Sequence, residues 1–221
     1  MTSSSSEFFQ FAALPDQVTT TPVFLDEAIL RTVQKDGPLH LHWPTPDNPG
    51  GVLSISSVSE WRAFVLGCSL RPGIPEIVAA KFRRAQMLYF LAWLYFDLIK
   101  AGELVALTTL ELALKDRYGH YVKDRKGNIH FSRLLKYMLN DGLTDQKIPM
   151  IRRCGGSAIG FVNGDSKPDL AELRNRQAHG DPFDALPVAG LLELVRDLIE
   201  YAYRDLDGRE ADMVAFGDSK R

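Results

Sequence analysis

The segment PEIVAAKFRRAQMLYFLAWLYFDLIKAG, residues 75–102, restricts the fold more than any other part of the chain. It opens with proline, which is favoured in the first turn of a helix, and after Met87 it is apolar around most of a helical circumference. Such a helix has to be surrounded by other elements. We therefore expect a buried central helix over 75–102, followed at once by a helix over 103–119 that packs against it as an antiparallel hairpin.

Three further helices are predicted after this hairpin. FSRLLKYMLNDG, residues 131–142, has apolar residues at helical spacing, and 186–206 has a long amphipathic pattern. Between them, Ser166 and Asp169 form a capping-box pattern that opens a helix ending near Gly180. The stretch 151–168 contains too many glycines for a helix and is expected to be a loop. The sequence thus predicts a mainly α fold, a bundle of about five helices.

Residues 1–70 have a different pattern of apolar and polar residues, which predicts a small N-terminal α/β appendage. A short helix is expected over 26–34, and PLHLHWP and GVLSISS alternate apolar and polar residues as a β-hairpin does. Ser57 and Glu60 can open another helix by a capping box. We therefore divide the chain into the appendage 1–70, the helical bundle 71–210 and a flexible tail 211–221. The appendage could bind a protein partner.

Composition excludes several classes of protein. With 45% hydrophobic and 24% charged residues the chain is typical of a globular protein. Cys68 and Cys154 lie far apart without metal-ligand spacing, which favours a reducing, cytoplasmic setting, and no cofactor is expected. His40 and His42 alternate on one strand face, but no third ligand accompanies them, so we predict no metal site. We recognise no export signal and no membrane-spanning run, and expect no membrane association.

Charge is unevenly distributed along the chain. Residues 111–180 hold 13 Lys and Arg against 8 Asp and Glu, whereas 1–110 hold 8 against 10 and 181–221 hold 5 against 10. The middle segment therefore carries a net charge of +5 in a chain of net charge −2. A local basic excess can attract a polyanion such as RNA, and it can equally be a solvated face.

The basic segment includes LRNRQAHGD, residues 173–181, in which Arg174, Asn175 and His179 follow one another closely. At 100° per residue Arg174 falls inside the apolar arc of its predicted helix, so its guanidinium needs a buried partner or a covering surface. Arg174 and His179 are about 140° apart on an ideal helix. They converge only if the last turn unwinds at Gly180 or a second copy of the site lies opposite. In the structural alternative, Arg174 pairs with an acid on the last helix and His179 is a helix cap.

Arg174, Asn175 and His179, followed by Gly180 near the end of a helical bundle, resemble the signature motif of the HEPN superfamily. In that family an arginine, an adjacent polar residue and a histidine four to six positions on form the signature. The segments TTLELALKDRYG and LLKYMLNDGL also resemble helices that precede the motif, and the resemblance covers roughly residues 75–206. It implies a HEPN-like bundle, a homodimer and, in many members, metal-independent RNA cleavage that leaves a 2′,3′-cyclic phosphate.

The resemblance also implies roles for the three residues. His179 would be the general acid or base, Arg174 would hold the scissile phosphate, and Asn175 would orient the histidine or the substrate. The two copies of the motif would face each other across a two-fold axis. Some members carry, two positions after the histidine, a tyrosine that is modified by an antitoxin; Asp181 stands there in this chain, so that mode of regulation is not expected.

Further cations of the basic segment are candidate RNA contacts. They are Arg176 beside the motif, Arg152 and Arg153 before a pair of glycines, and Lys123, Arg125 and Lys126 in a polar turn. A solvated turn explains the last three equally well. Two hypotheses follow: a homodimeric endoribonuclease acting as a toxin or in defence, or a non-catalytic HEPN-like module that binds RNA, a nucleotide or a protein partner.

Overall fold

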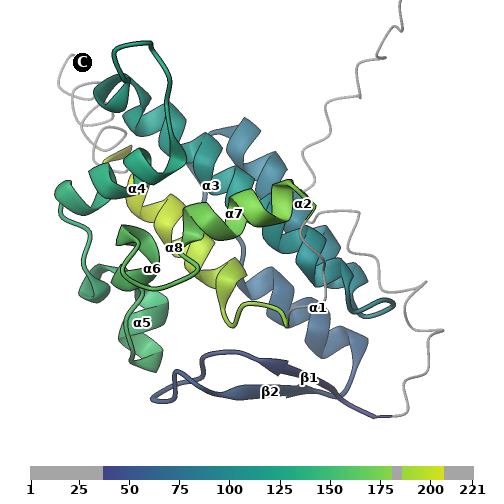
Figure 1. The fold of residues 1–221 in the computed structure, drawn as a ribbon. Coiled ribbons are helices and arrows are strands. Elements are labelled where there is room, and N and C mark those ends of the chain that lie inside the picture. The colour runs from purple at the N-terminus through teal and green to yellow at the C-terminus, as the bar shows by residue number, and fades with distance from the viewer. Residues whose placement is uncertain (1–36, 181–185, 207–221) are drawn as a thin grey trace, which may run out of the picture.

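The structure is a computed structural model and describes residues 37–180 and 186–206. These residues form a mainly helical fold with one two-stranded sheet, as predicted (Figure 1). The helices are α1 Val58–Gly67, α2 Glu76–Leu91, α3 Leu98–Val122, α4 Phe131–Asn140, α5 Pro149–Cys154, α6 Ile159–Asn163, α7 Leu170–Ala178 and α8 Leu191–Ala202, with a 3₁₀ turn, η3, at Asp145–Lys147. The expected helix at 26–34 and the tail 211–221 lie outside the described residues.

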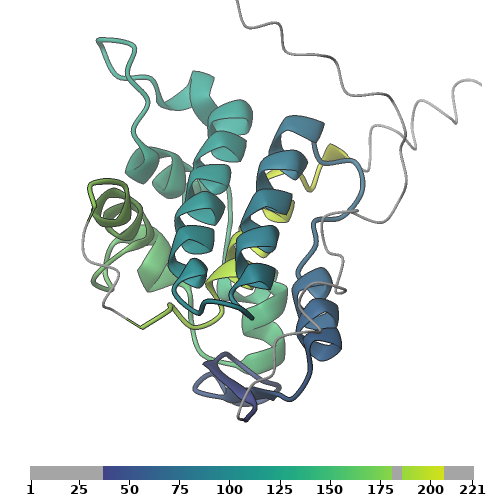
Figure 2. The same ribbon diagram turned by 90° about the vertical axis from the view of Figure 1, so that its right-hand side faces the viewer.

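Helix α3 is the centre of the fold. It packs against α2, α4, α7 and α8, and Figure 2 shows α2 and α3 running side by side. Leu107, Leu110 and Leu114 of α3 are fully buried. Burying a leucine side chain contributes about 1.5–3 kcal/mol, so the faces of α3 hold the neighbouring helices in place.

The predicted hairpin of buried helices exists, but its turn is misplaced in the prediction. The first helix ends at Leu91 instead of continuing to Gly102, and α3 begins at Leu98. Short-range bonds make the turn between them, including those from the Trp93 amide to the Phe90 carbonyl and from the Leu94 amide to the Leu91 carbonyl. This segment contains neither glycine nor proline, so its apolar periodicity gave no sign of the break.

The displaced turn puts Gly102 inside α3, where it faces α2. A Cβ on Gly102 would lie 2.6 Å from Cδ2 of Tyr89, whose side chain is fully buried. We expect Gly102→Ala to lower the free energy of unfolding by about 1–3 kcal/mol through overpacking, although alanine is the better helix former. Urea unfolding measures the change.

Gly119 of the same helix is the matched control for Gly102. A Cβ there would approach only the flexible end of Ile129, at 3.2 Å. Gly119→Ala should therefore be neutral or stabilise the fold by up to about 1 kcal/mol. Equal effects of the two substitutions would contradict the close approach of α2 and α3 at Gly102.

The predicted hairpin and the helix after it are confirmed. Strands β1, Leu39–His42, and β2, Val52–Ile55, pair antiparallel. The Ser57 hydroxyl accepts from the Glu60 amide at 3.2 Å and caps α1. Trp43 and Trp61 bury their rings in the same core as the helices, and the Trp61 indole donates to the Tyr89 carbonyl at 2.9 Å. The sheet and α1 are thus packed directly onto the bundle.

The expected loop 151–168 is wrong in part, because α5 and α6 occupy much of it. Gly155, Gly156 and Gly164 adopt positive φ angles at the connections between helices, so most of the glycines mark ends of short helices. The cap of α7 also differs from the prediction: the carboxylate of Asp169, and not Ser166, accepts from the Glu172 amide, at 2.8 Å.

The last helix is shorter than its amphipathic pattern predicts. Helix α8 begins at Leu191, after Gly190 with φ of 72°. Within the two described ranges every helix is too short or too polar to traverse a lipid bilayer.

Candidate functional site

Helix α7 carries the predicted motif and lies across α3 (Figure 1). Leu170 and Leu173 are buried and fix one face of this short helix against the bundle. His179 is the C-terminal cap, and Gly180 with φ of 79° ends the helical path. The motif thus occupies the second half of a helix that is anchored by its apolar side.

Arg174 is held by two neighbours. One terminal nitrogen forms an ion pair with Glu111 of α3, and the other donates to Oδ1 of Asn175 at 2.8 Å. Its Nε is buried, with no partner among the described residues. Of the two expectations for Arg174, a buried partner or a covering surface, the structure shows the partner, as in the structural alternative. The acid comes from α3 and not from the last helix. The guanidinium is therefore fixed in orientation while its side chain stays 27% exposed.

Glu111 is shared between two cations. Its other oxygen lies 2.7 Å from Nζ of Lys115, one turn further along α3. Although burial raises the pKa of Glu111, the hydrogen bonds and charges of Lys115 and Arg174 hold that pKa below its ordinary value. The carboxylate is therefore ionised at neutral pH and neutralises only part of the positive charge around it.

Lys81 of α2 adds to this charge. Its ammonium donates to the Thr108 carbonyl at 3.2 Å. Burial lowers the pKa of Lys81, Glu111 opposes this, and the nearby charges of Arg174, Arg84 and Lys115 lower it further. We call Lys81, Arg84, Lys115 and Arg174 the motif cluster: four cations from three helices, of which Lys115 and Arg174 contact Glu111. The sequence prediction missed its members on α2 and α3, and only the Glu111 to Lys115 spacing of four residues hints at it.

A second contact fixes α7 on α3. The Gln177 side-chain amide donates to Glu103 at 2.9 Å, and Glu103 is completely buried. The same carboxylate binds Nζ of Lys100 at 2.9 Å and accepts from the Val188 amide at 2.5 Å. Glu103 therefore ties together α3, α7 and the segment that leads to α8.

His179 is exposed and continues the geometry of α7. Its backbone amide donates to the Asn175 carbonyl at 3.0 Å, as in an α-helix. The same amide also donates to the Arg176 carbonyl at 3.2 Å, so the last turn tightens at His179 and stays coiled up to Gly180. On an ideal helix the side chains of Arg174 and His179 leave α7 about 140° apart, with Asn175 between them.

The other candidate cations differ in their surroundings. Arg153 forms an ion pair with Glu193 of α8, with Nη1 at 2.9 Å, which anchors α5. Arg152 and Arg176 are exposed. Lys123, Arg125 and Lys126 are exposed in the turn between α3 and α4, where Asp124 accepts from the Lys126 and Asn128 amides. None of these six residues belongs to the motif cluster.

Among the described residues, no three His, Cys, Asp or Glu side chains gather closely enough to hold a metal ion. Comparison with known proteins matched no family model, no curated protein and no solved structure.

Proposed function

We propose that this chain is a metal-independent endoribonuclease that acts as a homodimer, in which Arg174, Asn175 and His179 form the catalytic site. The observation that carries the proposal is the motif cluster of four cations, two of which, Lys115 and Arg174, contact Glu111. The exposed His179 caps the same helix that carries Arg174. Such an excess of positive charge attracts the phosphates of a polyanion. Toxicity or defence is the corresponding biological role.

The residues fit cleavage by the ribose 2′-hydroxyl. This oxygen attacks the adjacent phosphorus while a base removes its proton, the bond to the 5′-oxygen breaks, and an acid protonates that leaving oxygen. His179 supplies the acid or the base, since an imidazole can do either near neutral pH. Arg174, pre-oriented by Glu111 and Asn175, stabilises the negative charge that develops on the phosphate oxygens.

We infer a second chain for this chemistry from the spacing of the two residues on α7. On an ideal helix Arg174 and His179 leave α7 about 140° apart, which disfavours their meeting on one phosphate within a single chain. A two-fold axis beside α7 would bring Arg174 of one protomer opposite His179 of its partner. The catalytic site is then composite: one protomer contributes Arg174 and its partner contributes His179.

A second candidate function is supported by the ion pair of Arg174 with Glu111. An arginine already paired with a carboxylate can serve to hold α7 in place, and the motif cluster can bind RNA without cutting it. The chain is then a non-catalytic RNA-binding module.

Incubation of the purified protein with single-stranded RNA in EDTA distinguishes the two candidates. The endoribonuclease should yield fragments with 2′,3′-cyclic phosphate ends, identified by mass spectrometry, and should sediment as a dimer. Binding of RNA without fragments would replace it by the non-catalytic module. A protein that neither binds nor cuts RNA would reject both.

A further inference from the structure

A groove between the end of α3 and α4 lies apart from the motif cluster. Its volume is about 270 Å³, and its lining includes Tyr121 and Lys123 from the end of α3 and Arg133, Lys136 and Tyr137 from α4. We call it the α3–α4 groove. The proposed catalytic residues make no part of its lining.

Aromatic rings form one wall of this groove. Tyr121 and Tyr137 are stacked, with ring centroids 5.2 Å apart and an angle of 4° between their planes. Tyr118 supports Tyr137 from the buried side, at 5.1 Å between centroids. Tyr121 is nevertheless 61% exposed. His120 also contacts the Tyr121 ring, with centroids 3.7 Å apart. A large aromatic side chain that is still exposed between such neighbours is suited to stacking with a planar ligand.

Positive charge accompanies the rings. Lys123, Arg133 and Lys136 are all exposed, and among the described residues no carboxylate lines the groove. The nearby Asp124 is engaged by the amides of its own turn and lies 3.6 Å from His130. Lys123 and Lys136 are therefore available to an anionic ligand. Arg133 is exposed beside them, although its charge also acts on Asp124.

We propose that the α3–α4 groove binds an unpaired nucleotide of single-stranded RNA. The base stacks on the Tyr121 and Tyr137 pair, and Lys123, Arg133 and Lys136 bind the flanking phosphates. Such a combination of rings and cations favours single-stranded RNA, whose unpaired bases can stack on the tyrosines. In a duplex the bases already stack on one another. The inference rests on the proposed function in taking RNA as the polyanion, and it adds a substrate class: single-stranded over double-stranded RNA.

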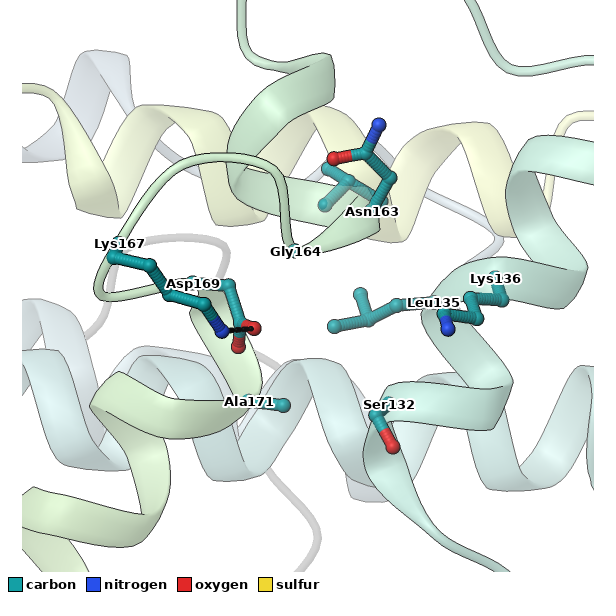
Figure 3. Close-up of a pocket in the computed structure, with 9 residues that line it drawn as sticks. Ser132, Leu135, Lys136, Asn163, Gly164, Lys167, Asp169 and Ala171 are labelled. Carbon is teal, nitrogen blue, oxygen red and sulfur yellow. Dashed lines mark hydrogen bonds and ion pairs between the residues drawn. The ribbon is translucent and has the colours of Figure 1, made fainter.

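Lys136 connects this groove with the helix that carries the motif. It also lines a hollow of about 200 Å³ between α4, α6 and α7, whose lining includes Ser132, Lys167 and Ala171 (Figure 3). From Ala171 one helical turn leads to Asn175 on the same face of α7. A strand bound in the α3–α4 groove can thus continue over Lys136 toward the motif.

Binding of a short single-stranded oligonucleotide with 2′-O-methyl groups tests the proposal, because this RNA cannot be cut through its 2′-oxygens. Fluorescence anisotropy with the full chain should show about tenfold or weaker binding for Tyr121→Ala, and near wild-type binding for Tyr121→Phe, which keeps the ring. Tyr95→Ala is the matched control, since Tyr95 is 63% exposed at the opposite end of α3. Each of K123Q, R133Q and K136Q should lower the slope of log affinity against log salt by about 0.7.

Two results would overturn the groove as a single-strand site. One is unchanged binding by Tyr121→Ala; the other is an equal loss with a duplex of the same sequence, which would mean recognition of backbone charge alone. Cleavage of RNA combined with either result leaves the proposed endoribonuclease standing. Tyrosine-dependent binding without cleavage leaves the groove standing and rejects the endoribonuclease.

Discussion

Replacing His179 by alanine is expected to reduce RNA cleavage by about 100- to 10,000-fold, the usual contribution of one general acid or base. The side chain is exposed and the helical bond at this position comes from its backbone amide, so the fold should be unaffected. Binding of RNA should persist, because the motif cluster does not include His179. Cleavage rates in EDTA and affinities for the uncuttable oligonucleotide measure the two properties separately.

Mixing two inactive variants tests whether the site is composite. A dimer of one Arg174→Ala chain and one His179→Ala chain keeps a single site with both side chains intact. Random exchange of equal amounts should therefore restore about one quarter of wild-type cleavage. Absence of any recovery, with exchange of protomers verified, would show that Arg174 and His179 act within one chain and that the site is not composite.

The second large effect is expected at Glu103. Glu103→Leu should lower the free energy of unfolding by about 3–5 kcal/mol, because the ammonium of Lys100 then remains buried without its counter-charge. The Lys100 side chain is only 7% exposed, and the Val188 amide and the Gln177 side chain also lose their acceptor. Chemical denaturation measures the loss of free energy of unfolding. The folded variant should keep the helical content of the wild type.

The double variant Lys100→Met with Glu103→Leu is the control for that explanation. It removes both charges and replaces them by apolar groups of similar size, so much of the lost stability should return. If the double variant is as unstable as Glu103→Leu, the damage comes from the lost hydrogen bonds to α7 and the segment before α8, and the ion pair contributes little.

The sequence predicted the class of fold because helical periodicity is a local signal. It missed the turn after Leu91. An apolar run without glycine or proline has the same local pattern whether it forms one long helix or two helices joined by a turn. It also assigned the cap of α7 to Ser166, although Asp169 is an equally good cap and stands directly before the apolar run. Local patterns predict which elements exist better than where they begin and end.

The candidate site shows the same limit on a larger scale. The position of Arg174 in an apolar arc predicted that it needs a partner, and Glu111 is that partner. Sixty-three positions separate the two residues, and no local pattern identifies contacts over such a span. The ring pair of Tyr121 and Tyr137 is likewise created by the packing of α3 on α4, as is the gathering of Lys81 with the other cations.

The two contacts of α7 with α3 have a consequence for how this chain can evolve. Arg174 binds Glu111 and Gln177 binds Glu103, and two contact points stop a short helix from rotating about its own axis. The contacts made by Glu103 and Glu111 therefore fix the rotation of α7 about its axis, and with it the direction of the His179 side chain. In descendants of this chain, substitutions at position 111 should occur together with substitutions at 174, and those at 103 together with those at 177. Such pairs would preserve the orientation of the histidine.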